Sequence, residues 1–124
     1  MDIIKIKEFA DKLKFETTIT KTGLIIQPGH TKFKGVPVYV RFVFDNDILY
    51  TYVVVDGFSG DIIHINVTGL SDKKVKDAII YLLKSTIEAL NIIRSEYNYK
   101  KSNYNSKIIK KMAKDIRSYI NSKG

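Results

Sequence analysis

Seven cations near the C-terminus form the largest set of residues in this chain that could share one ligand. They are Lys100, Lys101, Lys107, Lys110, Lys111, Lys114 and Arg117. The last five follow a spacing that places neighbours on one side of a helix, about 5–6 Å apart, where they can contact successive phosphates. Tyr99 and Tyr104 lie in the same segment and could stack on unpaired bases. This pattern predicts a nucleic-acid surface; the alternative is a solvated helix face with the tyrosines packed at a helix–helix corner.

The distribution of charge also favours an anionic partner for this segment. Residues 1–70 carry 8 basic and 8 acidic side chains, whereas residues 71–124 carry 13 and 5, so the second part holds the whole net charge of +8. The segment 98–124 alone carries 8 basic residues and 1 acidic residue. Only 3 of the 21 cations are arginines, the residue that most often reads guanine, so we expect contacts to the phosphate backbone with little base specificity.

A second candidate site is one face of a predicted sheet. Strand alternation brings together Tyr39, Arg41, Tyr50, Tyr52, His64 and Asn66, beside Val43 and Val54. Tyrosine and arginine are enriched at binding hot spots, and tyrosines on a sheet can stack on a base or a nucleotide. The face therefore predicts docking of another protein, self-association or capture of an anionic nucleotide, unless a helix covers it.

The loop 27–35, with the sequence QPGHTKFKG, is a third candidate. His30, Lys32 and Lys34 surround Phe33 and could hold a phosphate, although most glycine-containing loops only connect elements.

Residues suited to catalysis or metal binding are few. His30 and His64 could form an acid–base pair, but nothing in the sequence brings them together. Two pairs of acids bracket turns without the ligand spacing of a calcium loop, and there is no cysteine, phosphate-binding glycine motif or nucleophile elbow. We therefore expect a protein that is not an enzyme and needs no cofactor or metal.

The clearest structural pattern lies in residues 37–55, which predict a β-hairpin. With Asn46–Asp47 as a two-residue turn, Asp45 pairs with Ile48, and the register continues to Val38 opposite Val55. This register sorts apolar side chains onto one face and the tyrosines onto the other. A loosely alternating strand over 17–26 precedes the hairpin.

The segment 62–69 predicts a fourth strand after a five-residue connection. Ile63, Ile65 and Val67 would face the core, and His64 and Asn66 the opposite side.

Three helices complete the predicted fold. Asp2 can cap the first, Ser71 a long one that reaches about Glu96, and Asn105 or Ser106 the last. The predicted class is α+β, a single domain over residues 1–124: an N-terminal helix, a four-stranded antiparallel meander, and a long helix plus a basic C-terminal helix packed on one sheet face.

Composition sets the wider limits. With 124 residues and 44% hydrophobic content the chain suits one folded domain, and no apolar run approaches the ~20 residues of a membrane span. The lack of cysteine and of a signal-peptide pattern predicts a cytoplasmic protein with no membrane association. Abundant lysine, isoleucine and asparagine suggest an AT-rich genome, and a small chain of this kind suits a phage or a mobile element.

Three functional hypotheses follow. The leading one is a small non-catalytic protein that binds DNA or RNA through its basic C-terminal segment. The alternative is a protein-interaction module that docks through the tyrosine and arginine sheet face, as a homo-oligomer or as an inhibitor of a partner protein. The expected partner is therefore nucleic acid or an acidic protein, and a homo-oligomer is expected. The third is a binder of an anionic nucleotide.

Overall fold

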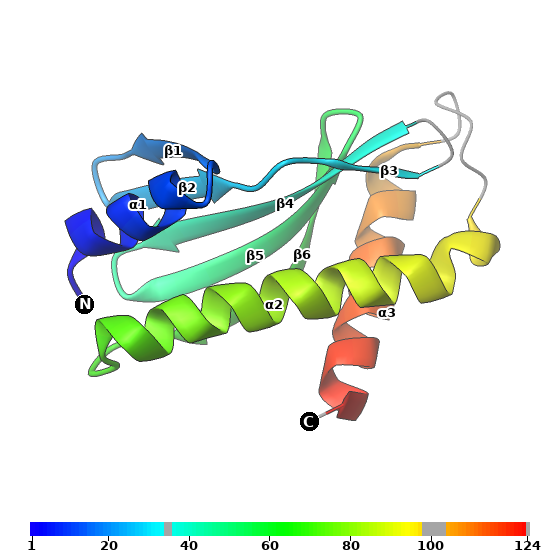
Figure 1. The fold of residues 1–124 in the computed structure, drawn as a ribbon. Coiled ribbons are helices and arrows are strands. Elements are labelled where there is room, and N and C mark those ends of the chain that lie inside the picture. Colours follow the sequence, from blue (N-terminus) through cyan, green and yellow to red (C-terminus); the bar gives the residue numbers. More distant parts are fainter. Residues whose placement is uncertain (34–35, 98–103, 124) are drawn as a thin grey trace.

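An antiparallel sheet with helices packed on one of its faces makes up the molecule (Figure 1). The structure is a computed structural model, and it describes residues 1–33, 36–97 and 104–123. The α+β class predicted from the sequence is confirmed.

The sheet has the strand order β1-β2-β4-β5-β6. Its strands are β1 (Glu16–Ile19), β2 (Gly23–Gln27), β3 (Thr31–Phe33), β4 (Val36–Asp45), β5 (Ile48–Val55) and β6 (Phe58–Asn66). β2 pairs with the end of β4, and the short β3 pairs with the start of β4 along the same edge. The path therefore has five strands where the sequence predicted four.

The additional strand arises because the segment predicted as one strand over 17–26 is a hairpin. β1 and β2 pair in the register Glu16 with Gln27 and Ile19 with Leu24, and the amide of Thr20 donates to the carbonyl of Gly23 at 3.0 Å. Alternation is loose here because polar residues interrupt it at the turn, between Ile19 and Gly23. β3 likewise lies inside the segment predicted as a loop.

The β4–β5 hairpin has the predicted register throughout. Asp45 pairs with Ile48, Phe42 with Thr51 and Val38 with Val55. The core-facing side chains of this hairpin are almost fully buried, whereas Tyr39, Tyr50 and Tyr52 keep intermediate exposure. Period-two alternation thus predicted both faces correctly.

The β5–β6 connection is shorter than predicted. Two residues, Asp56 and Gly57, form the turn, with φ of +51° and +83°, where we expected five. Aspartate followed by glycine suits a two-residue turn with positive φ at both positions. A β-bulge at Ile62 then adds one residue to β6, so Ile63 still lies opposite Thr51 and His64 opposite Tyr50, on the predicted faces.

The helices are α1 (Ile3–Lys12), α2 (Asp72–Ile93), which runs into a short 3₁₀ turn η1 (Arg94–Glu96), and α3 (Ser106–Lys123). The predicted caps are present: the Asp2 carboxylate accepts from the amides of Ile4 and Lys5, and the Ser71 hydroxyl from that of Lys74. None of the described helices is long and apolar enough to cross a membrane.

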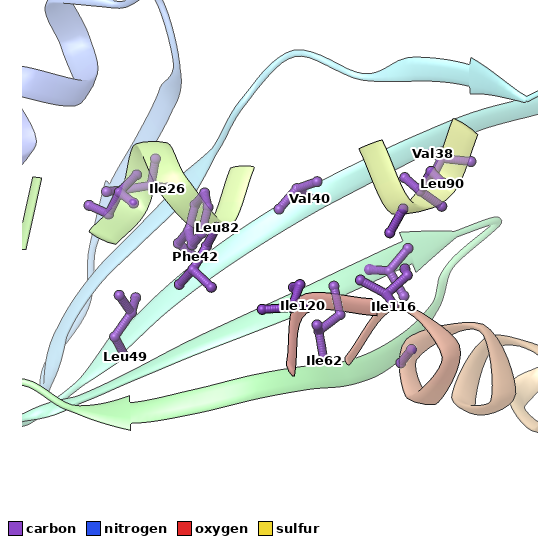
Figure 2. Packing of buried hydrophobic residues seen from close by; sticks show 14 of the residues in the cluster. Ile26, Val38, Val40, Phe42, Leu49, Ile62, Leu82, Leu90, Ile116 and Ile120 are labelled. Atoms are coloured by element: carbon purple, nitrogen blue, oxygen red, sulfur yellow. The ribbon is translucent and has the colours of Figure 1, made fainter. Parts of the chain in front are cut away.

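All three helices pack against the apolar face of the sheet. Figure 2 shows the core along β4 to β6; in this view Leu82 of α2 lies next to Phe42, and Ile120 of α3 lies next to Ile62. Ile6 and Ala10 of α1 belong to the same buried cluster. Full burial of such side chains stabilises the fold by about 1.5–3 kcal/mol each relative to exposure. The opposite sheet face, which carries the tyrosines, is left open by every described helix.

Candidate functional site

α3 lies directly on β6, and a glycine permits the close approach. A Cβ atom on Gly60 would lie 2.7 Å from the carbonyl oxygen of Ile109 and 2.8 Å from the Cβ of Ala113. Ile109, Met112 and Ile116 of the same helix are fully buried. The inner face of α3 therefore fixes the direction in which its cations point.

Arg117 takes part in this packing. Its Nε donates to the carbonyl oxygen of Ile62 at 2.5 Å, and its Nη2 donates to that of Asp61 at 2.6 Å. Both carbonyls belong to the β-bulge of β6, which exposes backbone groups at the edge of the sheet. The guanidinium that the sequence assigned to phosphate binding thus already holds two backbone acceptors.

Lys111 is paired within its own helix. Its Nζ lies 2.9 Å from a carboxylate oxygen of Asp115 and 5.4 Å from the centre of the Tyr97 ring, and the Tyr97 hydroxyl donates to the same oxygen at 2.6 Å. Burial disfavours the charged form of Asp115, but the hydrogen bonds from Tyr97 and Lys111 outweigh it and lower the pKa of the carboxyl. The hydrogen bond to Asp115 raises the pKa of Lys111. Lys111 remains exposed, yet its charge is already paired with the Asp115 carboxylate.

The C-terminal end of α3 is tied to α2. Lys123 and the Tyr119 hydroxyl both donate to the Glu88 carboxylate, at 2.8 and 3.0 Å. The hydrogen bond from Lys123, followed by that from Tyr119, lowers the pKa of Glu88. Lys123 therefore also has a partner within the molecule.

Lys107, Lys110 and Lys114 make up the exposed lysine row of α3. All three are exposed, and none forms an ion pair with the residues that the structure describes. Residues 104–123 contain six basic residues and one acidic residue. The row extends over the eight residues 107–114, or about 10 Å along the helix axis.

Tyr104, one of the two tyrosines predicted to stack on bases, does not form part of this row. Tyr104 is 5% exposed and Tyr97 is 9% exposed, and both belong to the buried cluster, as in the alternative in which they pack at a helix–helix corner. Tyr99, Lys100 and Lys101 lie outside the described residues. The described surface of α3 thus offers charge and no exposed tyrosine for base stacking.

The outer sheet face brings its predicted residues together. Tyr50 and Tyr52 lie with ring centres 6.0 Å apart at an interplanar angle of 11°, and Tyr50 lies 5.4 Å from His64. Burial, then the nearby Asp61 charge, raises the pKa of Tyr52. Asn66 lies at the end of β6 opposite Ile48 and is exposed, with its side-chain oxygen accepting from the amide of Thr68.

At the other end of the same face, Arg41 is held by a residue that the sequence did not single out. Its Nε and Nη2 both donate to the side-chain oxygen of Gln27, at 3.0 and 2.9 Å. Gln27 was predicted to begin a loop, and only the pairing of β2 with β4 places it beside Arg41. Tyr39 lies nearby on β4, with the His30 ring 5.4 Å away.

The loop candidate is therefore joined to the sheet face through His30. A hollow of about 190 Å³ beside Tyr39 is lined by His30, Lys14 and Gln27, among others. The structure describes only the backbone of Lys32, in β3, and Lys34 lies outside the described residues.

The two histidines have separate surroundings. His30 contacts Tyr39, whereas His64 on β6 has its Nδ1 3.4 Å from the Asp61 carboxylate. Among residues 1–33, 36–97 and 104–123, no three histidine, aspartate or glutamate side chains gather in a way that could hold a metal ion.

In comparisons with known proteins, no family model, curated protein or solved structure matches this chain.

Proposed function

We propose that the protein binds nucleic acid without catalysis, through the phosphate backbone, using the exposed lysine row of α3. The observation that supports this most directly is the row itself: Lys107, Lys110 and Lys114 are exposed, unpaired within the described structure and carried by a helix packed tightly on β6. Lys111 lies beside them and supplies a further, partly compensated charge.

The geometry favours contacts that do not depend on base sequence. About 10 Å of helix axis matches roughly three phosphates of one duplex strand, which are spaced ~3.4 Å apart along the duplex axis. Lysine acts as a point charge, and the guanidinium of Arg117, which could read a guanine, is engaged by β6. With Tyr97 and Tyr104 buried, the described surface of α3 favours duplex over single strands.

The test is fluorescence anisotropy with labelled duplex and single-stranded DNA and RNA over a salt series. Replacing Lys110 and Lys114 by glutamate should weaken duplex binding about 10- to 100-fold at low salt and reduce the slope of log K against log salt by about 2. The matched control replaces Lys5 and Lys12, two exposed lysines of α1, by glutamate, which changes the net charge equally.

An equal loss in the α1 control would show that total charge, not the row, governs binding. No binding by the unmodified protein at low salt would reject the proposed function.

A second candidate function is protein docking through the outer sheet face, as a homo-oligomer or on another protein. The observation that favours it is the cluster of Tyr50, Tyr52 and His64, which no described helix covers. Light scattering would test self-association: a dimer that Tyr52→Ala dissociates supports it, and a monomer at high concentration argues against it.

A further inference from the structure

We infer that the hollow beside Arg41 on the outer sheet face binds a small planar anion of the nucleotide type. It is a site distinct from the lysine row of α3, and the inference does not depend on nucleic-acid binding. The hollow measures about 700 Å³. Its lining includes Gln27, Pro37, Tyr39, Arg41, Val54 and Asp56.

Arg41 supplies an oriented positive charge that forms no direct ion pair with a described carboxylate. Of the five N–H groups of a guanidinium, one on Nε and one on Nη2 are taken by the neutral oxygen of Gln27, which leaves three for a ligand. Arg41 is partly buried, and it forms no ion pair with a carboxylate within the described chain. A half-buried guanidinium held by a neutral amide is suited to a phosphate or carboxylate, because the anion would neutralise it with paired hydrogen bonds.

The remaining wall of the hollow is suited to a flat ring. Tyr39 presents an aromatic surface, and Pro37 and Val54 add apolar contacts on the same side of the sheet. A volume of this size falls within the ~300–1,000 Å³ of typical ligand sites, which combine apolar walls with a few polar groups. A ring on Tyr39 would place its anionic substituent toward Arg41.

Asp56 indicates which planar anions would suit the hollow. This carboxylate lines the same hollow at the β5–β6 turn. An ionised carboxylate can accept several hydrogen bonds, and one of these could come from a ring amino group or from a sugar hydroxyl. A nucleoside monophosphate has all three features: a planar ring, N–H or O–H donors, and one terminal phosphate.

The test is a ¹H–¹⁵N NMR titration of the full chain with adenosine 5′-monophosphate, alongside adenosine and inorganic phosphate as separate probes. The largest shifts should fall at Gln27, Tyr39, Arg41 and Gly57. The monophosphate should bind more tightly than either probe that carries only the ring or only the anion. Arg41→Gln should weaken its binding at least about tenfold, whereas Arg94→Gln, at an exposed arginine of η1, should not.

The titration also separates this site from the lysine row. The variant with Lys110 and Lys114 replaced by glutamate should bind the monophosphate as the unmodified protein does. Shifts centred on α3, equal affinity for inorganic phosphate alone, or no shifts at the four named residues would each overturn the inference. The titration of the unmodified chain decides this even if Arg41→Gln fails to fold.

Discussion

The basic surface of α3 and the outer face of the sheet differ in how many of their predicted binding residues are already engaged within the molecule. On α3, Arg117 is bound to β6 and Lys111 to Asp115, so packing already uses part of the charge. On the sheet, tyrosines and an arginine from β4 and β5 share one open surface with His64 of β6. A count of cations does not separate those that hold the fold from those that meet a ligand, whereas strand register places side chains directly.

A substitution that separates α3 from β6 should have the largest effect on the stability of the protein. Gly60→Val would push side-chain atoms into the backbone of Ile109 and the Cβ of Ala113, and we expect a loss of about 2–3 kcal/mol in the free energy of unfolding. Urea denaturation measures it. Gly29→Val is the matched control, because nothing lies within 4 Å of a Cβ there. Equal stability of the two variants would show that α3 is not held closely on β6, and the lysine row would lose its rigid support.

Substitutions of Arg117 and Lys114 compare a cation that packs against β6 with an exposed cation of the same helix. Arg117→Met removes the donor from two carbonyls of the β6 bulge and should cost about 1–3 kcal/mol of stability. Lys114→Met should leave the stability within about 0.5 kcal/mol and instead reduce the salt slope of duplex binding by about 1. Thermal unfolding and anisotropy on both variants measure the two effects. If Arg117→Met kept full stability, the assignment of this cation to packing would be wrong.

Substitution of Tyr97 tests how much its hydrogen bond to Asp115 contributes to stability, and this is the smallest of the expected effects. Tyr97→Phe removes one hydrogen bond to the carboxylate and should cost about 1–2 kcal/mol at neutral pH. The pKa of Asp115 is lowered in the folded protein, so its contribution to stability is complete above the unfolded pKa of about 3.9 and is lost as the pH falls through the folded pKa.

Urea denaturation of both proteins at neutral and acid pH tests this sign. The difference in stability between Tyr97→Phe and the unmodified protein should shrink in acid. A difference that is independent of pH would mean that the Tyr97 hydroxyl does not act through the Asp115 carboxylate.

Much of the fold was predictable because its signals are local. The β4–β5 register followed from period-two alternation and a two-residue turn, and the helix caps followed from Asp2, Ser71 and Asn105. The β1–β2 hairpin and the short β5–β6 turn were missed. In the first, polar residues obscured the alternation, and in the second the bulge at Ile62 made a longer connection fit the same faces.

By itself, the sequence determined that the tyrosines share one sheet face and that the last helix is amphipathic and basic, because both properties depend only on residue spacing along one element or one hairpin. Only the tertiary structure decided which charged side chains have partners within the molecule. Arg117 meets carbonyls 55 and 56 residues away, and Gln27 reaches Arg41 only because β2 pairs with β4. Such partners depend on strand order and on how closely a helix approaches the sheet, and no local pattern encodes either one.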